Sequence, residues 1–155
     1  NLWEGEILSR FTWKGNEFNV RTVCHPAQDM ISAHIDSHLH TGIKFHFPYP
    51  TGIHTDNACD WDANDKHSTE VLKQDTQSAV LKRTLDSTVY YVELKWEGKA
   101  LLKEKEKNYF VLLPQEDAFS FSCAFTANEP DQLTVLPDFF EVESLAKNHW
   151  VNFWE

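Results

Sequence analysis

The stretch STVYYVELKWEGKALLKEKEK, from Ser87 to Lys107, decides the fold class. Apolar and polar residues alternate on both sides of a short EGK sequence, and alternation of this kind is the period of a β-strand with one buried face. The glycine in EGK favours a turn between the two segments. The stretch therefore predicts two strands, over 87–96 and 100–107, joined by a turn.

Further segments with the same period lie on both sides of this pair. In one of them Phe18, Val20, Thr22 and Cys24 share a face. The spacing is roughly the 8 to 12 residues that are typical of a sandwich or a barrel. The sequence therefore predicts an all-β domain over 1–137. The remaining period-two segments are 6–13, 17–25, 29–36, 43–49, 67–74, 78–85, 108–114 and 118–127.

A helical pattern appears only at the C-terminal end, over 138–155. Apolar residues recur there at steps of three and four, the period of one helical face. They are Val142, Leu145, Ala146, Trp150, Phe153 and Trp154. Neither a glycine nor a proline marks the end of this helix, and its last turn carries large rings that need a packing partner. We therefore expect the natural protein to continue beyond Glu155, with 138–155 as the start of a helical linker.

Charge and cysteine content exclude several classes of protein. The formal net charge of −10 argues against a nucleic-acid partner, because phosphate binding needs a basic patch. No apolar run approaches the roughly 18 residues that span a bilayer, so no membrane partner is expected. Three cysteines without CxxC spacing indicate neither a disulfide framework nor a zinc knuckle. Cys24 and Cys123 are predicted to be buried free thiols because they lie at alternating apolar positions.

The long irregular stretch 48–66 is the first place to look for a site, because long loops inside compact domains are often functional. Asp60, Asp62 and Asn64 supply oxygens at alternate positions, as in a calcium-binding EF-hand loop. The motif then fails, because Asp65 stands where the turn needs glycine and Val71 where a bidentate Glu is needed. No calcium site is predicted, although an irregular one remains an alternative.

The histidines of HIDSHLH give a second candidate for metal binding. His34, Asp36, His38 and His40 would share one face of a continuous strand. The turn signal that follows predicts that the strand ends near Asp36, which breaks this alignment. We expect exposed loop histidines, and the sequence predicts no metal and no cofactor.

The DWD sequence of the same stretch is typical of sugar recognition. A Trp61 ring stacks on the apolar face of a sugar, while Asp60 and Asp62 accept hydrogen bonds from its hydroxyls. Two alternatives remain: the sequence anchors the loop by burying its ring, or the carboxylates are a catalytic pair. Motifs for nucleophilic catalysis and phosphate-binding glycine loops are absent from the sequence.

Several of these motifs, in their order, resemble the N-terminal domain of bacterial enzymes of the glycosyl hydrolase family 65 group. The resemblance begins at LWEGEILSRFTWKGNEFNVRTVCHPAQDMISAHIDS and covers nearly the whole chain. Later motifs of that domain, in the same order, are similar to FPYP, DWD, RTLDSTVYYVELKWEG and FSFSCAFT. The helix that precedes the catalytic domain is similar to HWVNFWE.

The resemblance implies a supersandwich of the galactose-mutarotase-like kind, joined by a linker helix to an α/α barrel. The general acid Glu of such enzymes lies in the barrel, so no catalytic residue is predicted in this chain. Its partner would be the downstream barrel, with Trp150, Phe153 and Trp154 packing between the domains. The alternatives are a self-standing carbohydrate-binding module that uses Trp61 and, by analogy of fold alone, a small mutarotase-like enzyme.

Overall fold

The computed structural model describes residues 1–155 with the exception of 2, 39–40, 55–56 and 134. A long series of strands is followed by one helix, α1 (Phe139–Trp154). All the predicted segments form strands, and the short β5 and β6 are added within 48–66. The strands are β1 (Glu6–Trp13), β2 (Asn16–Cys24), β3 (Met30–Asp36), β4 (Ile43–His46), β5 (Tyr49–Pro50), β6 (Cys59–Asp60), β7 (His67–Gln74), β8 (Ser78–Leu85), β9 (Thr88–Trp96), β10 (Ala100–Glu106), β11 (Tyr109–Pro114) and β12 (Ala118–Thr126).

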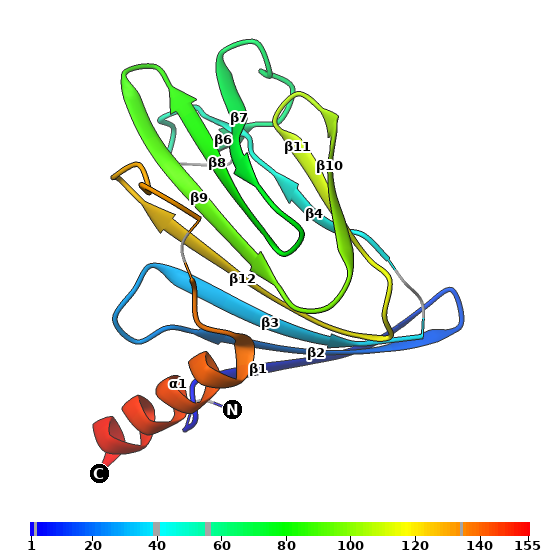
Figure 1. The fold of residues 1–155 in the computed structure, drawn as a ribbon. Helices are drawn as coiled ribbons and strands as arrows, with labels where there is room; N and C mark the ends of the chain where they lie inside the picture. The colour runs from blue at the N-terminus through cyan, green and yellow to red at the C-terminus, as the bar shows by residue number, and fades with distance from the viewer. Residues whose placement is uncertain (2, 39–40, 55–56, 134) are drawn as a thin grey trace.

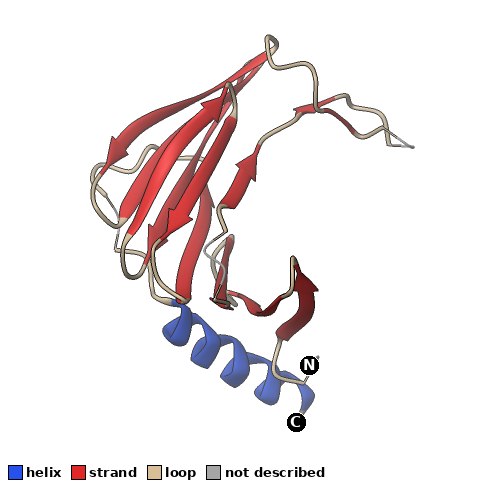
Figure 2. Ribbon diagram, turned by 90° about the vertical axis from the view of Figure 1, so that its right-hand side faces the viewer, coloured by secondary structure: helices blue, strands red, loops and turns tan. Residues whose placement is uncertain are grey.

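The strands form two main antiparallel sheets, and the prediction of an all-β sandwich with a C-terminal helix is confirmed (Figure 1). The large sheet has seven strands in the order β1-β2-β3-β12-β9-β8-β7, and the small sheet has three in the order β10-β11-β4. β5 and β6 pair separately with each other. The large sheet curves strongly, as the side view in Figure 2 shows.

Tight turns fix the pairing of neighbouring strands. Lys14 and Gly15 connect β1 to β2 with φ values of 50° and 78°. Positive φ at both central residues defines the hairpin turn whose twist matches that of the strands. Trp13 and Asn16 therefore face each other directly across the turn. Asn108, with φ of 64°, lies in the short turn between β10 and β11.

The main core lies between the small sheet and one half of the large sheet. Side chains of β8, β9 and β12 point from the large sheet toward those of β10 and β11. Trp96, Leu81 and Phe110 are 1%, 0% and 0% exposed. The buried members of this core are Ala79, Leu81, Val92, Leu94, Trp96, Leu102, Phe110, Leu112, Phe119 and Cys123.

Helix α1 covers the opposite face of the large sheet, beneath β2, β3 and β12 (Figures 1 and 2). Asp138 caps the helix, because its carboxylate accepts from the N–H of Glu141 and the Glu141 carboxylate accepts from the N–H of Asp138. Phe139, Val142 and Ala146 are buried against the sheet. Among the described residues, no helix is both long and apolar enough to cross a membrane.

The inner face of β1, β2 and β3 extends beyond the small sheet and carries exposed apolar side chains. Ile7, Phe11, Trp13 and Ile31 are 65%, 50%, 47% and 40% exposed. Cys24 at the end of β2 is also exposed, so the prediction that its thiol is buried is wrong. The alternation of apolar residues placed these side chains on the correct face, but no second layer covers that part of the face among the described residues.

Candidate functional site

Three ring side chains gather on the outer face of the small sheet. His46 at the end of β4 and Tyr109 at the start of β11 are register partners, and their ring centroids are 5.1 Å apart. The loop after β6 brings Trp61 to the same place, with its centroid 4.8 Å from that of His46. Trp61 is 49% exposed. The alternative that the DWD sequence anchors its loop by burying this ring is therefore wrong.

The two aspartates beside Trp61 differ in their surroundings. Asp60 lies in β6 opposite Tyr49, and its carboxylate accepts a hydrogen bond of 3.0 Å from the N–H of Asp62. This contact holds the turn that displays Trp61. Asp62 is exposed. The site thus combines one half-exposed indole with one carboxylate that shapes the loop and one that faces solvent.

Tyr49, near the start of the 48–66 stretch, links it to the large sheet. Its hydroxyl donates to the Asp86 carboxylate, with oxygen distances of 3.0 and 3.1 Å, and its ring centroid lies 5.8 Å from that of His67. The hydrogen bond to Asp86 raises the pKa of Tyr49 above its ordinary value. The Lys66 ammonium lies 5.4 Å from the centroid of the same ring.

Directly beneath the loop lies a buried polar network that the sequence analysis missed. The Arg83 guanidinium is 1% exposed, and its Nη1 donates to Thr69 Oγ1 at 2.7 Å and to Asn108 Oδ1 at 3.2 Å. The same Nη1 lies 2.9 Å from His67 Nδ1. Because Asn108 belongs to the β10–β11 turn, these contacts tie the two sheets together. Arg83 is the sixth residue of a strand whose alternating positions are otherwise apolar, a weak signal for a buried charge.

The protonation of His67 follows from this environment. Burial lowers the pKa of His67 below its ordinary value of 6.5, and the positive charge of Arg83 lowers it further. A neutral imidazole can accept through Nδ1 from the Arg83 guanidinium. The ring of Phe47 covers the guanidinium from another side, with its centroid 4.8 Å from Arg83 Cζ. The network contacts the Trp61 loop, because Asn108 Nδ2 donates to the Asn64 carbonyl at 3.3 Å.

His34 and His38, the described histidines of HIDSHLH, make separate contacts. His34 Nδ1 lies 2.8 Å from Ser120 Oγ, and its ring packs against Phe139 of α1. His38 Nδ1 lies 2.9 Å from an Asp117 carboxylate oxygen, and His40 lies outside the described residues. β3 ends at Asp36, as predicted. No group of three His, Cys, Asp or Glu side chains that could hold a metal ion occurs in the described part of the chain.

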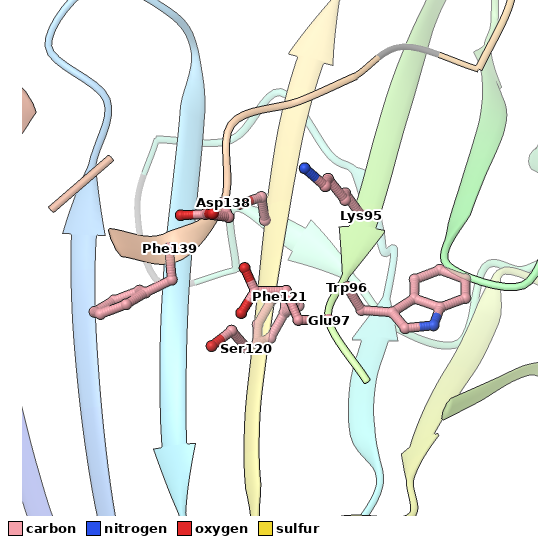
Figure 3. Close-up of a pocket in the computed structure, with 8 residues that line it drawn as sticks. Lys95, Trp96, Glu97, Ser120, Phe121, Asp138 and Phe139 are labelled. Carbon is pink, nitrogen blue, oxygen red and sulfur yellow. The ribbon is translucent and has the colours of Figure 1, made fainter. Parts of the chain in front are cut away.

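The start of α1 packs tightly against the large sheet. Figure 3 shows Asp138 and Phe139 beside Lys95 of β9 and Ser120 of β12. The Lys95 ammonium donates to the Leu136 carbonyl at 2.6 Å, and Ser122 Oγ donates to the Pro137 carbonyl at 3.0 Å. The space among these residues does not admit a water molecule, so it is a packing contact rather than a ligand site.

The end of α1 carries a second group of rings. Trp150 lies over Gly5, where an added Cβ would come within 2.1 Å of the indole Cδ1. Trp154 stacks on Trp3, with 6.0 Å between centroids and 14° between planes. Phe153 contacts both Trp150 and Trp154. Phe153, Trp3 and Trp154 are 63%, 55% and 46% exposed. Trp150 thus packs back on the N-terminal segment, while the other rings keep a large exposed area.

No protein-family model matches the chain, and a search of curated proteins found no significant match. The ring side chains around Trp61 and those at the end of α1 are the two candidate contact surfaces.

Proposed function

We propose that the chain is the non-catalytic N-terminal β-sandwich domain of a carbohydrate-active enzyme, a hydrolase or phosphorylase that acts on α-glucosides. In this proposal α1 leads to a helical catalytic barrel, and the sandwich supports that barrel. The observation that supports it is the exposed group of rings formed by Trp3, Phe153 and Trp154. Burial of such a ring contributes about 2 to 3 kcal/mol, so a partner that covers all of them would gain substantially.

Charge contacts fix the direction in which these rings point. Glu4 binds the Lys147 ammonium at 3.0 Å, and Arg21 forms ion pairs with Glu6 and Glu143. The N-terminal segment, β2 and α1 are thereby held together next to the rings. A rigid surface loses less conformational entropy on binding than a mobile one, so this surface is suited to a permanent contact between domains.

The coding sequence on the 3′ side of this chain gives the most direct test. The proposal predicts an uninterrupted reading frame that continues for a full helical domain containing acidic residues. A stop codon soon after Glu155 would contradict it. Hydrolysis of an α-glucoside by the chain Asn1–Glu155 alone would contradict it as well, because the proposal places the reacting groups in the barrel.

The half-exposed Trp61 supports a second function, the contact of a sugar with the outer face of the small sheet. Its indole is 49% exposed, contacts the His46 ring and is followed in the chain by the exposed Asp62. An open indole next to a carboxylate matches the apolar face and the hydroxyls of a glucose unit. This contact fits a carbohydrate-binding module, and it equally fits a loop that extends the substrate site of an attached enzyme.

Calorimetric titration with α-linked glucose oligosaccharides tests this contact. Binding by the chain and its loss in Trp61→Ala are expected. Trp13→Ala is the matched control, because Trp13 is 47% exposed and lies on a different sheet. Equal affinity of the two variants, or no binding by the wild-type chain, would contradict the sugar contact at Trp61.

A further inference from the structure

The outer edge of β1 is open and lacks the features that protect the other sheet edges. Bulges, charged side chains or short length usually prevent an edge strand from pairing with another chain. β7 has a register shift between Val71 and Lys73, β10 has one between Glu104 and Glu106, and β4 has four residues. β10 is also highly charged. β1 has eight residues in continuous register with β2, and it pairs with no other described strand.

The hairpin geometry determines which backbone groups of β1 face outward. Trp13 and Asn16 flank a two-residue turn, so they hydrogen-bond to each other, and the odd-numbered residues of β1 point their N–H and C=O toward β2. The even-numbered residues point outward. Glu6 agrees, because its N–H donates to the Asn1 carbonyl at 3.1 Å and its C=O accepts from the Asn1 nitrogen at 2.6 Å. The outward groups of Leu8, Arg10 and Thr12 remain available for a further strand.

We propose that this edge pairs with the β1 edge of a second copy of the chain, antiparallel and around a twofold axis at Phe11. Such pairing would join two large sheets into one continuous sheet. The proposal goes beyond the domain's role in a carbohydrate-active enzyme and is independent of it. A hollow of about 350 Å³ lies over the β1–β2 hairpin, bordered by Arg10, Phe11 and Thr12 of β1 and by Glu17, Phe18 and Asn19 of β2.

Several other positions of the axis are blocked. Asn1 occupies the edge at Glu6, so a partner strand cannot extend past that residue. An axis at Ser9 or closer to Glu6 would push the second copy's strand into Asn1. An axis at Arg10 would place two guanidinium groups directly opposite each other, and like charges at opposed positions are destabilising.

An axis at Phe11 avoids both conflicts. Arg10 then faces the second copy's Thr12, and their outward backbone groups exchange N–H···O=C bonds on both sides of the axis. Phe11 faces Phe11, and Trp13 faces the second copy's Ser9, so a large ring lies opposite a small side chain. These pairs lie on the uncovered inner face, where Phe11 and Trp13 are 50% and 47% exposed. Cross-strand aromatic pairs contribute to sheet stability, and these would be closely opposed non-hydrogen-bonded pairs.

Charge at position 11 gives the sharpest test of a twofold axis. In sedimentation equilibrium the wild-type chain is expected to dimerise as its concentration rises. Phe11→Lys places two ammonium groups face to face and should weaken the dimer by about 100-fold, and Phe11→Glu should do the same. A mixture of the two variants should form a heterodimer, because Lys then opposes Glu. The control Phe125→Lys, at a 44% exposed ring away from this edge, should leave the dimer intact.

Two further variants test the pairing without placing a charge at position 11. Thr12→Pro removes an outward N–H without removing a bond to β2, so it should weaken the dimer while the fold is kept. In a Cys24→Ser, Cys59→Ser background, Phe11→Cys should form an intermolecular disulfide, because opposed residues at the axis lie about 4.5 Å apart. Thr12→Cys should not. A monomeric wild-type chain at all concentrations, or a mixture of the Lys and Glu variants that stays monomeric, would overturn the proposal.

Discussion

The two halves of the large sheet share an alternation of apolar and polar residues but have different surroundings. In β8, β9 and β12 the apolar side chains of the inner face meet the small sheet, and Trp96 is 1% exposed. In β1, β2 and β3 the inner face continues with Ile7, Phe11 and Trp13, all about half exposed or more. On that second half, helix α1 covers the outer face and leaves the inner face uncovered. The difference shows that alternation specifies which face of a strand is apolar, whereas the neighbouring layer decides whether that face is buried.

The strongest test of this comparison is a matched pair of tryptophan substitutions. Trp96→Ala removes a ring from the covered half, including its Nε1–H donation to the Thr76 carbonyl at 3.1 Å. It should lower the free energy of unfolding by about 3 to 5 kcal/mol. Trp13→Ala removes a half-exposed ring from the uncovered half, and the expected loss is below about 1 kcal/mol.

Urea unfolding at low protein concentration measures both losses, since dilution keeps the chain monomeric. The comparison fails if Trp13→Ala costs as much as Trp96→Ala. In that case the inner face of β1 and β2 would be covered in solution by a part of the chain.

A second test concerns the polar network that joins the sheets in the covered half. Arg83→Met removes the donor shared by Thr69, Asn108 and His67. The buried Nδ1 of His67 loses this donor, while Asn108 Oδ1 still accepts from the Thr69 hydroxyl. The expected loss of unfolding free energy is about 2 to 4 kcal/mol. Lys82→Met on the opposite face of β8 is the control and should change stability by less than about 0.5 kcal/mol. Equal effects of the two substitutions in urea unfolding would show that the network does not join the layers.

The strands and the helix were predictable because their signals are local. The hairpin of β1 and β2 needed only alternation and the glycine at position 15, and α1 needed only a repeat of three and four residues. The pairing of β12 with both β3 and β9 was not predictable in this way. It brings together segments far apart in the chain, and period-two patterns carry no information about which strands become neighbours.

The surroundings of the candidate sites required the tertiary structure. The DWD sequence identified Trp61, but its contact with His46 depends on a loop that returns to the small sheet. Arg83 gave only a weak signal, because a charged residue at an alternating position usually faces water. Cys24 was predicted to be buried because its neighbours on the same face are apolar, and the missing second layer reversed that outcome.

The smallest expected effect is a pH dependence that distinguishes the covered half from the exposed loops. Since burial and the charge of Arg83 lower the pKa of His67, the unfolded chain binds a proton at this residue more readily than the folded chain. The stabilising contribution of neutral His67 is complete above pH 6.5, and it is lost as the pH falls from 6.5 toward the lower pKa of the folded state.

The wild-type chain should therefore become less stable over that interval. His67→Gln should reduce the slope of unfolding free energy against pH, because its amide does not titrate. Urea unfolding at a series of pH values measures these slopes, and a wild-type slope retained by His67→Gln would mean that the proton binds elsewhere.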